Sequence, residues 1–205
     1  MAEASRYLVP AGTHRVETSV KRSRFIATAA RAPDADAAHA LVGRVRAEMP
    51  NATHHCWAFV AGPPGSTAQI GMSDDGEPHG TAGRPMLTAL LHGGVGEIAV
   101  VCTRYFGGTK LGTGGLSRAY ADAVKLVLGS LPVVGKVERV RLDVTVGYPE
   151  IDALRRLVAE RDVVVEEEEY GSEVRYRLAV PAPDLEAFRE TLAELSQGRA
   201  VIDGP

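Results

Sequence analysis

The sequence predicts an α+β protein built from two domains. Two observations indicate this. Strand-like and helix-like segments alternate irregularly up to about residue 130, whereas residues 138–205 follow one regular order of elements. Between them, Leu131, Pro132 and Gly135 interrupt the pattern, and we place the boundary at residues 135/136. A chain of 205 residues with 45% apolar and 24% charged residues is long enough for two ordinary globular domains.

The first domain, residues 1–135, is predicted to be mixed helix and strand. Apolar spacings of three and four indicate helices that begin near residues 34, 83 and 113, and the last of these is the longest. Strands are expected over 13–20, 23–30, 55–61, 68–72 and 97–103. The segment EIAVVCT (97–103) is almost continuously apolar, as expected for a strand buried on both faces.

The second domain, residues 136–205, shows a cleaner pattern. Apolar residues alternate from Val140 to Val146, a helix follows Pro149, and two strands (162–170 and 173–180) flank Gly171 and Ser172. A second helix and a short strand over 199–202 complete the order βαββαβ, which is typical of a ferredoxin-like domain. Because its regular pattern, over residues 138–205, covers only about 68 residues, its core is expected to be small.

Charge differs between the two domains. Residues 1–137 carry a net charge of +4 and residues 138–205 a net charge of −7. A nucleic acid would therefore favour the first domain, and the acidic second domain would suit a protein partner. The run Glu166–Glu169 is expected to be a solvated hairpin edge, paired across the hairpin with Arg175 and Arg177.

The chain shows no features of a membrane or secreted protein. It has no apolar run of about 18 residues, and MAEASRYLVPAG lacks the apolar core of a signal peptide. We therefore expect a cytoplasmic protein. Cys56 and Cys102 lie in apolar runs and are expected to be buried free thiols.

Eleven of the 22 glycines fall in residues 73–118, a stretch that holds two glycine-rich loops, each of which leads into a helix. In the second loop, the exposed N–H groups of a helix start at Thr113, Gly114 and Gly115 would attract an anion. Arg104, Lys110 and Arg118 would add positive charge. The glycines could equally serve only to turn a strand tightly onto its helix. The loop matches neither GxxxxGK[ST] nor GxGxxG.

The first loop, SDDGEPHGTAGRP (73–85), carries both acidic and basic side chains. Thr81 is expected to cap the next helix, with Arg84 in its first turn. Its carboxylates, Asp74, Asp75 and Glu77, suit Mg²⁺ beside a phosphate, or else form turns and ion pairs.

Histidines and aromatic residues lie close to both loops. His54 and Cys56 share one face of a strand and His55 takes the other, so zinc binding is not expected there. His54, His55 or His79 could serve as a general acid or base, and no serine or cysteine has an evident base partner. The dipeptide Tyr105-Phe106 could stack on bases or pack in the core.

Three segments, HHCWAF (54–59), SDDGEPHGTAGRPM (73–86) and VVCTRYFGGTKLGTGGLSRAY (100–120), resemble the IMPACT/YigZ family. The match covers residues 15–130, and residues 138–205 resemble the second domain of its bacterial, YigZ-like members, which is similar to a domain of elongation factor G. The resemblance implies a first domain with the two-layer α/β fold of GHMP-type kinases and a ribosomal protein, and a role near translation. Eukaryotic members regulate a kinase of an initiation factor and carry a further N-terminal domain. Here the similar region begins within the first 20 residues, so that regulation is not carried over.

Three functions remain open. The first is an RNA- or ribosome-binding protein that could regulate translation and that uses Arg84, Arg104, Lys110, Arg118 and the glycine loops. The second is a Mg²⁺-dependent enzyme or a binder of a phosphorylated small molecule in the same cleft. The third is a protein-interaction module. No cofactor is required by the first or the third.

Overall fold

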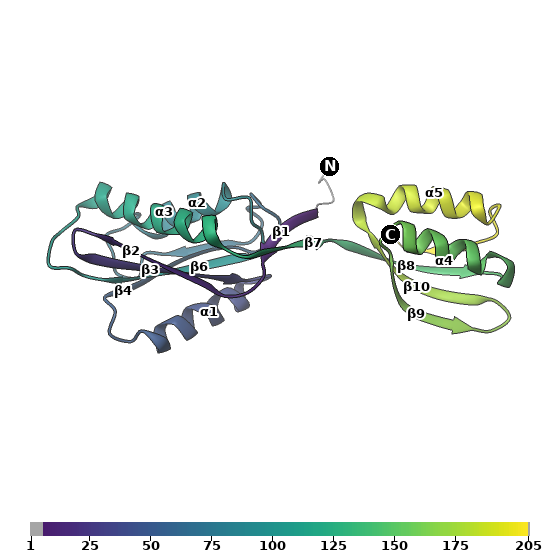
Figure 1. Ribbon diagram of the computed structural model, residues 1–205, viewed down its shortest axis with the longest axis horizontal. Helices are drawn as coiled ribbons and strands as arrows, with labels where there is room; N and C mark the ends of the chain where they lie inside the picture. Colours follow the sequence, from purple (N-terminus) through teal and green to yellow (C-terminus); the bar gives the residue numbers. More distant parts are fainter. Residues whose placement is uncertain (1–5, 205) are drawn as a thin grey trace. The chain divides into compact units, whose positions relative to one another are not determined.

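The computed structural model describes residues 6–204 and divides into two compact units (Figure 1). The first holds Tyr7–Lys136, and the second holds Arg6 and the residues from Val137 onward. Each has its own hydrophobic core. The chain is therefore a mixed helix and strand protein with two domains.

The first unit is built on a five-stranded antiparallel sheet in the order β2-β3-β6-β4-β5. The central strand β6 (Ile98–Tyr105) is buried along almost its whole length, as the apolar run predicted. The remaining strands are β2 (His14–Val20), β3 (Ser23–Arg31), β4 (His54–Val60) and β5 (Ile70–Ser73).

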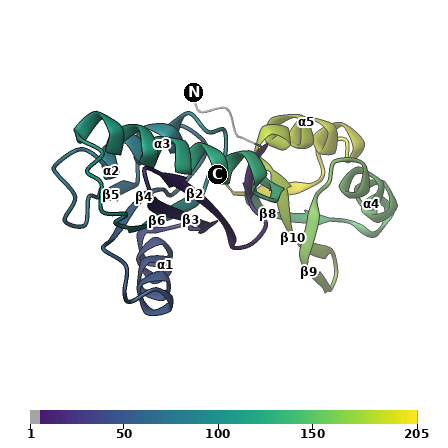
Figure 2. The same cartoon turned by 60° about the vertical axis from the view of Figure 1, so that its left-hand side comes forward.

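Helices cover both faces of this sheet (Figures 1 and 2). On one face α2 (Gly83–Leu91) and α3 (Thr113–Ser130) pack on a core that includes Phe25, Val100 and Tyr120. On the other, α1 (Ala35–Glu48) packs through Leu41 and Val45 on a separate cluster. The two layers implied by the resemblance are thus joined by a third.

Two strands were not predicted. β1 (Arg6–Pro10) and β7 (Val133–Val137) pair in a small sheet, although Pro10 and Gly135 are typical of loops. The buried carboxylate of Glu97 fixes this corner, since it accepts hydrogen bonds from Tyr7 and Lys136. Long-range pairing and a buried ion pair therefore override the local pattern here.

The second unit has the predicted element order. Its antiparallel sheet runs β11-β8-β10-β9, and helices α4 and α5 cover one face through Leu154, Leu157, Phe188 and Leu192 (Figure 1). The elements are β8 (Arg139–Val146), η1 (Tyr148–Glu150), α4 (Ile151–Glu160), β9 (Val164–Tyr170), β10 (Val174–Pro181), η2 (Ala182–Asp184), α5 (Leu185–Leu195) and β11 (Val201–Asp203). Within residues 6–204, no helix is long and apolar enough to cross a membrane.

Candidate nucleic-acid interface

The first glycine loop closes on its own carboxylate. Asp74 Oδ1 accepts hydrogen bonds from the N–H groups of Ala82 (2.9 Å) and Gly83 (2.8 Å), and Oδ2 accepts one from Gly80 (2.7 Å). Burial alone would raise the pKa of Asp74, but these three donors hold it below its ordinary value. The expected cap at Thr81 is wrong, because its hydroxyl donates to the Pro78 carbonyl and Asp74 takes the start of α2.

Asp75 also has a structural role. Its Oδ2 accepts from the His55 N–H (2.6 Å), and Oδ1 accepts from Arg46 on α1. Its carbonyl oxygen lies 2.8 Å from Nδ1 of His54. Asp75 therefore ties the first loop to β4 and α1.

The third carboxylate, Glu77, is buried with a basic partner. Arg104 Nη1 donates to Glu77 Oε1 (2.6 Å), and so does the hydroxyl of Tyr120 (2.7 Å). Arg104 is only 5% exposed and also donates to Ser23. The expectation that Arg104 offers a surface charge is therefore wrong, because Glu77 neutralises it inside the domain.

These contacts bear on the magnesium hypothesis. All three candidate carboxylates accept hydrogen bonds from the protein itself. In the described part of the chain, no group of three His, Cys, Asp or Glu residues is arranged to hold a metal ion. His79 is fully exposed, and its Nδ1 lies 3.9 Å from Asp74.

Both cysteines are buried free thiols, as predicted, and face each other across β4 and β6. Burial raises the pKa of Cys56 to about 12, and it also raises the pKa of Cys102. Both thiols are therefore protonated at neutral pH and are poor nucleophiles.

The second loop, by contrast, leaves its helix start open. α3 begins after Gly112, which has a φ of 76° and provides no side-chain cap. Thr113 and Gly114 are exposed, Gly115 is half-buried, and the first turn has no acidic residue. Its free N–H groups and the helix dipole therefore favour an anion.

Sequence reasoning missed two further cations beside this loop. Lys21 and Arg22 form the turn between β2 and β3, with φ values of 46° and 69°. Gly107 packs against that turn so closely that a Cβ there would lie 2.0 Å from the Arg22 carbonyl carbon. The Arg22 guanidinium also reaches Thr109 Oγ1 (3.4 Å). The Lys-Arg dipeptide between two predicted strands was the feature of the sequence that could have indicated these cations.

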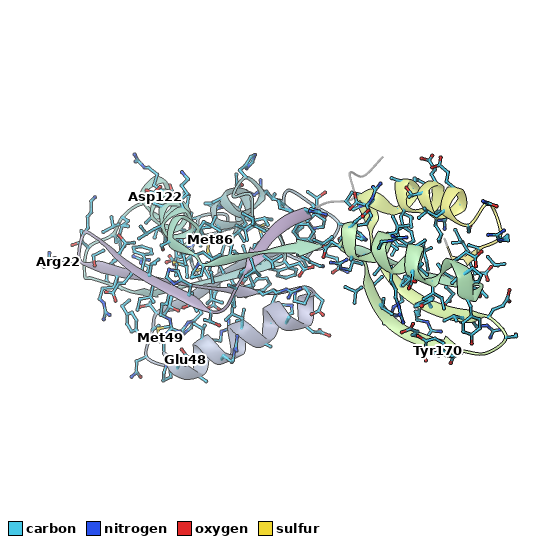
Figure 3. All side chains as sticks on the ribbon, turned by 45° about the vertical axis from the view of Figure 1, so that its right-hand side comes forward. Arg22, Glu48, Met49, Met86, Asp122 and Tyr170 are labelled. Carbon is cyan, nitrogen blue, oxygen red and sulfur yellow. The ribbon has the colours of Figure 1, made fainter. Side chains whose placement is uncertain are left out.

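Four exposed cations thus belong to the two segments that meet here, and Figure 3 labels Arg22 at the end of its hairpin. Arg118 is one turn into α3, where its Nε lies 3.5 Å from the Gly114 carbonyl oxygen. We call this set the basic end: Lys21, Arg22, Lys110 and Arg118.

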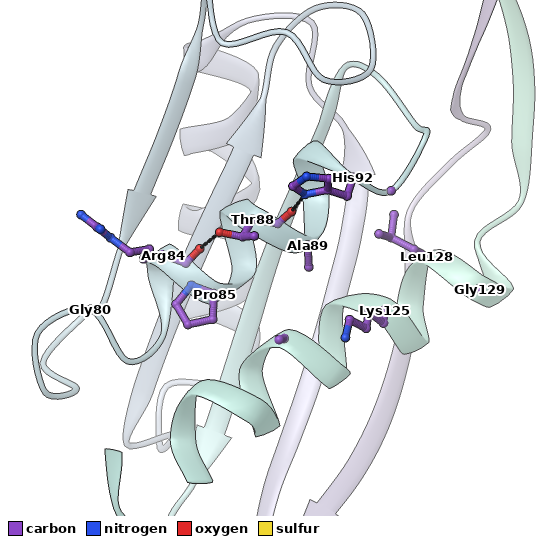
Figure 4. A pocket seen from close by; sticks show the side chains of 11 residues that line it. Gly80, Arg84, Pro85, Thr88, Ala89, His92, Lys125, Leu128 and Gly129 are labelled. Carbon is purple, nitrogen blue, oxygen red and sulfur yellow. Dashed lines mark hydrogen bonds between the residues drawn. The ribbon is translucent and has the colours of Figure 1, made fainter. Parts of the chain in front are cut away.

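Arg84 lies elsewhere on the first unit. It lines an open groove of about 810 Å³ between α2 and α3, with Lys125 and His92 as the other basic residues (Figure 4). Leu128 and Ala89 contribute apolar surface, and no carboxylate lines the groove. Arg84 is therefore exposed, as expected, but it faces a different surface feature from the basic end.

On the second unit, β9 is an exposed edge strand, as predicted for the Glu166–Glu169 run. Arg177 pairs with Glu167 and Asp143, and Arg141 pairs with Glu166. The predicted ion pairing of Arg177 is confirmed. Arg175 lies opposite Glu169 in the sheet, but among residues 6–204 it forms no ion pair. A shallow hollow on this sheet includes further carboxylates such as Glu169, Glu173 and Asp203.

Comparisons with known proteins match both units. The family model described as the Impact N-terminal domain matches residues 21–128, and a domain of unknown function (DUF1949) matches residues 144–199. The chain is 42% identical to IMPACT family member YigZ of Escherichia coli (strain K12) over 192 residues, 94% of each chain. It is 40% identical to an IMPACT family member of Haemophilus influenzae, covering 97% of this chain and 96% of that one. A crystal structure described as that of a hypothetical protein aligns with a TM-score of 0.70 at 40% identity and covers 97% of both chains.

Proposed function

The chain belongs to the IMPACT family, and from this premise we propose that it binds RNA, free or on the ribosome, through the basic end of its first domain. The observation that carries the proposal is the gathering of exposed cations beside the uncapped start of α3. Such a surface suits the phosphates of a nucleic-acid backbone. A role in regulating translation would follow from binding at a functional site on the ribosome.

Charge supports this choice of surface. From Ile98 to Ala121 the sequence contains no Asp or Glu, so the second loop and the first half of α3 have no carboxylate of their own. Arg24 beside the turn is neutralised by Glu17, whereas Lys21, Lys110 and Arg118 form no ion pair in the described region. When a lysine or arginine neutralises a phosphate, counterions are released from the nucleic acid, and a side chain without an acidic partner is free to do so.

The test is the salt dependence of RNA binding. Lys21→Ala with Lys110→Ala should lower affinity for a labelled single-stranded RNA and flatten the plot of log K against log salt by about 1.4, because each phosphate contact contributes about 0.7 for single strands. Fluorescence anisotropy at several salt concentrations, together with ribosome co-sedimentation, measures both effects.

The matched control is Arg44→Ala with Arg156→Ala, which removes two exposed arginines from α1 and α4. This variant should keep the original slope. Salt-independent binding, or equal slopes for the two double variants, would contradict the proposal.

The rival proposal, a Mg²⁺-dependent site for a phosphorylated small molecule, has less support. Its three carboxylates are engaged in holding the first loop. Thermal stabilisation by a sugar phosphate or nucleotide only when Mg²⁺ is present would favour it over RNA binding.

A further inference from the structure

Phe106 differs from the other phenylalanines of this protein. It is 48% exposed, whereas Phe25, Phe59 and Phe188 are almost fully buried. Burial of a phenylalanine side chain stabilises a fold, and much of that contribution is forgone here.

Arg104 contacts the ring of Phe106, and Thr53 holds its backbone. The guanidinium carbon of Arg104 lies 5.6 Å from the centroid of Phe106 and equally far from that of Phe25. Arg104 is itself fixed by Glu77, and the Phe106 N–H donates to Thr53 Oγ1 (3.2 Å). The ring is therefore pre-organised by a buried cation, which lowers the ordering cost of binding a ligand on its open side.

The position of Phe106 links it to the basic end. It directly precedes Gly107, whose backbone packs on Arg22. Its ring lies against the Arg104 guanidinium, which also donates to Ser23 at the end of the β2–β3 turn. An RNA strand whose phosphates contact Lys21 and Lys110 would pass beside the exposed ring of Phe106. Bases stack on such rings, but the bases of a duplex are already paired and stacked.

We propose that Phe106 is a stacking platform for one unpaired base, so that the basic end prefers single-stranded RNA to duplex RNA. This inference rests on the proposed function and specifies its ligand. Arg104, expected from the sequence to contact phosphate, supports the ring instead.

The experiment compares Phe106→Ala with Phe106→Tyr on two probes. These are a labelled RNA of about 16 nucleotides without internal complementarity, near the upper limit for one binding domain, and the same strand annealed to its complement. Phe106→Ala should weaken single-strand binding about 5- to 150-fold, equivalent to about 1–3 kcal/mol for one stacked base. Duplex binding and the salt slope should be unchanged, and Phe106→Tyr should retain the affinity.

Leu126→Ala is the matched control, since Leu126 is a 46% exposed apolar residue on α3. It should leave both affinities unchanged, and circular dichroism confirms that each variant is folded. An equal loss on both probes, or no loss for Phe106→Ala, would overturn the stacking role while salt-dependent binding still supports the basic end. Failure of the original protein to bind either probe, together with failure to co-sediment with ribosomes, would overturn both proposals.

Discussion

At the scale of single residues, Asp74 shows how one carboxylate can decide whether a glycine loop binds an anion. It occupies three N–H donors around the start of α2, the place that an external phosphate would take. The second loop has no such residue, so of these two helices α3 is the one with an open start. Both loops are rich in glycine, and they differ in whether a carboxylate of the protein accepts hydrogen bonds at the helix start.

Asp74→Ala should destabilise the protein by about 2 kcal/mol at neutral pH, the upper range for a lost helix cap, because three donors lose their acceptor. The folded-state pKa of Asp74 is lowered, so its contribution is present above the ordinary carboxyl pKa and is lost as pH falls through the folded value. Urea unfolding should therefore show a smaller difference between variant and original protein near pH 3. Asp122→Ala, which removes an exposed aspartate on α3, should have little effect at either pH.

At the scale of elements, the contact between the β2–β3 turn and the second loop assembles the basic end. It depends on Gly107, since a Cβ there would lie within 2.3 Å of three backbone atoms of Arg22 and Ser23. Backbone atoms cannot move aside as a flexible side chain can. This position therefore requires glycine for space, and no left-handed conformation is involved.

Gly107→Ala should lower the free energy of unfolding by about 1–3 kcal/mol, the usual cost of overpacking. Gly114→Ala is a close control, because its Cβ would meet nothing within 4 Å and its helical position favours alanine. Chemical denaturation should give a lower free energy of unfolding for Gly107→Ala than for Gly114→Ala. Equal stabilities would show that the turn and the loop are not in firm contact.

At the scale of the whole molecule, the two units have separate cores and should respond separately to damage. Leu178→Ala in β10 and Leu90→Ala in α2 each remove a buried side chain, at a cost of about 2–5 kcal/mol. Hydrogen exchange measured by mass spectrometry should show faster exchange only in the unit that carries the change. Faster exchange throughout the chain for either variant would indicate a single cooperative unit.

Sequence patterns predicted most elements of this molecule, because their apolar spacing reports which face is buried. They did not predict β1 and β7, whose pairing depends on partners more than 100 residues apart in the sequence. Nor did they separate Arg104 from Lys110, because burial of a charge depends on a partner such as Glu77. Residue types located the two loops, while only the folded contacts distinguish an open helix start from a closed one.

The pairing of β1 with β7 has a consequence for biosynthesis. β1 is made before β7, and this hydrogen-bonding partner begins only at Val133. At about 5–20 residues per second, translation of the intervening chain takes roughly 6–25 seconds. During this time the edge of β1 lacks its partner strand, and the first domain completes its fold only after β7 has been made.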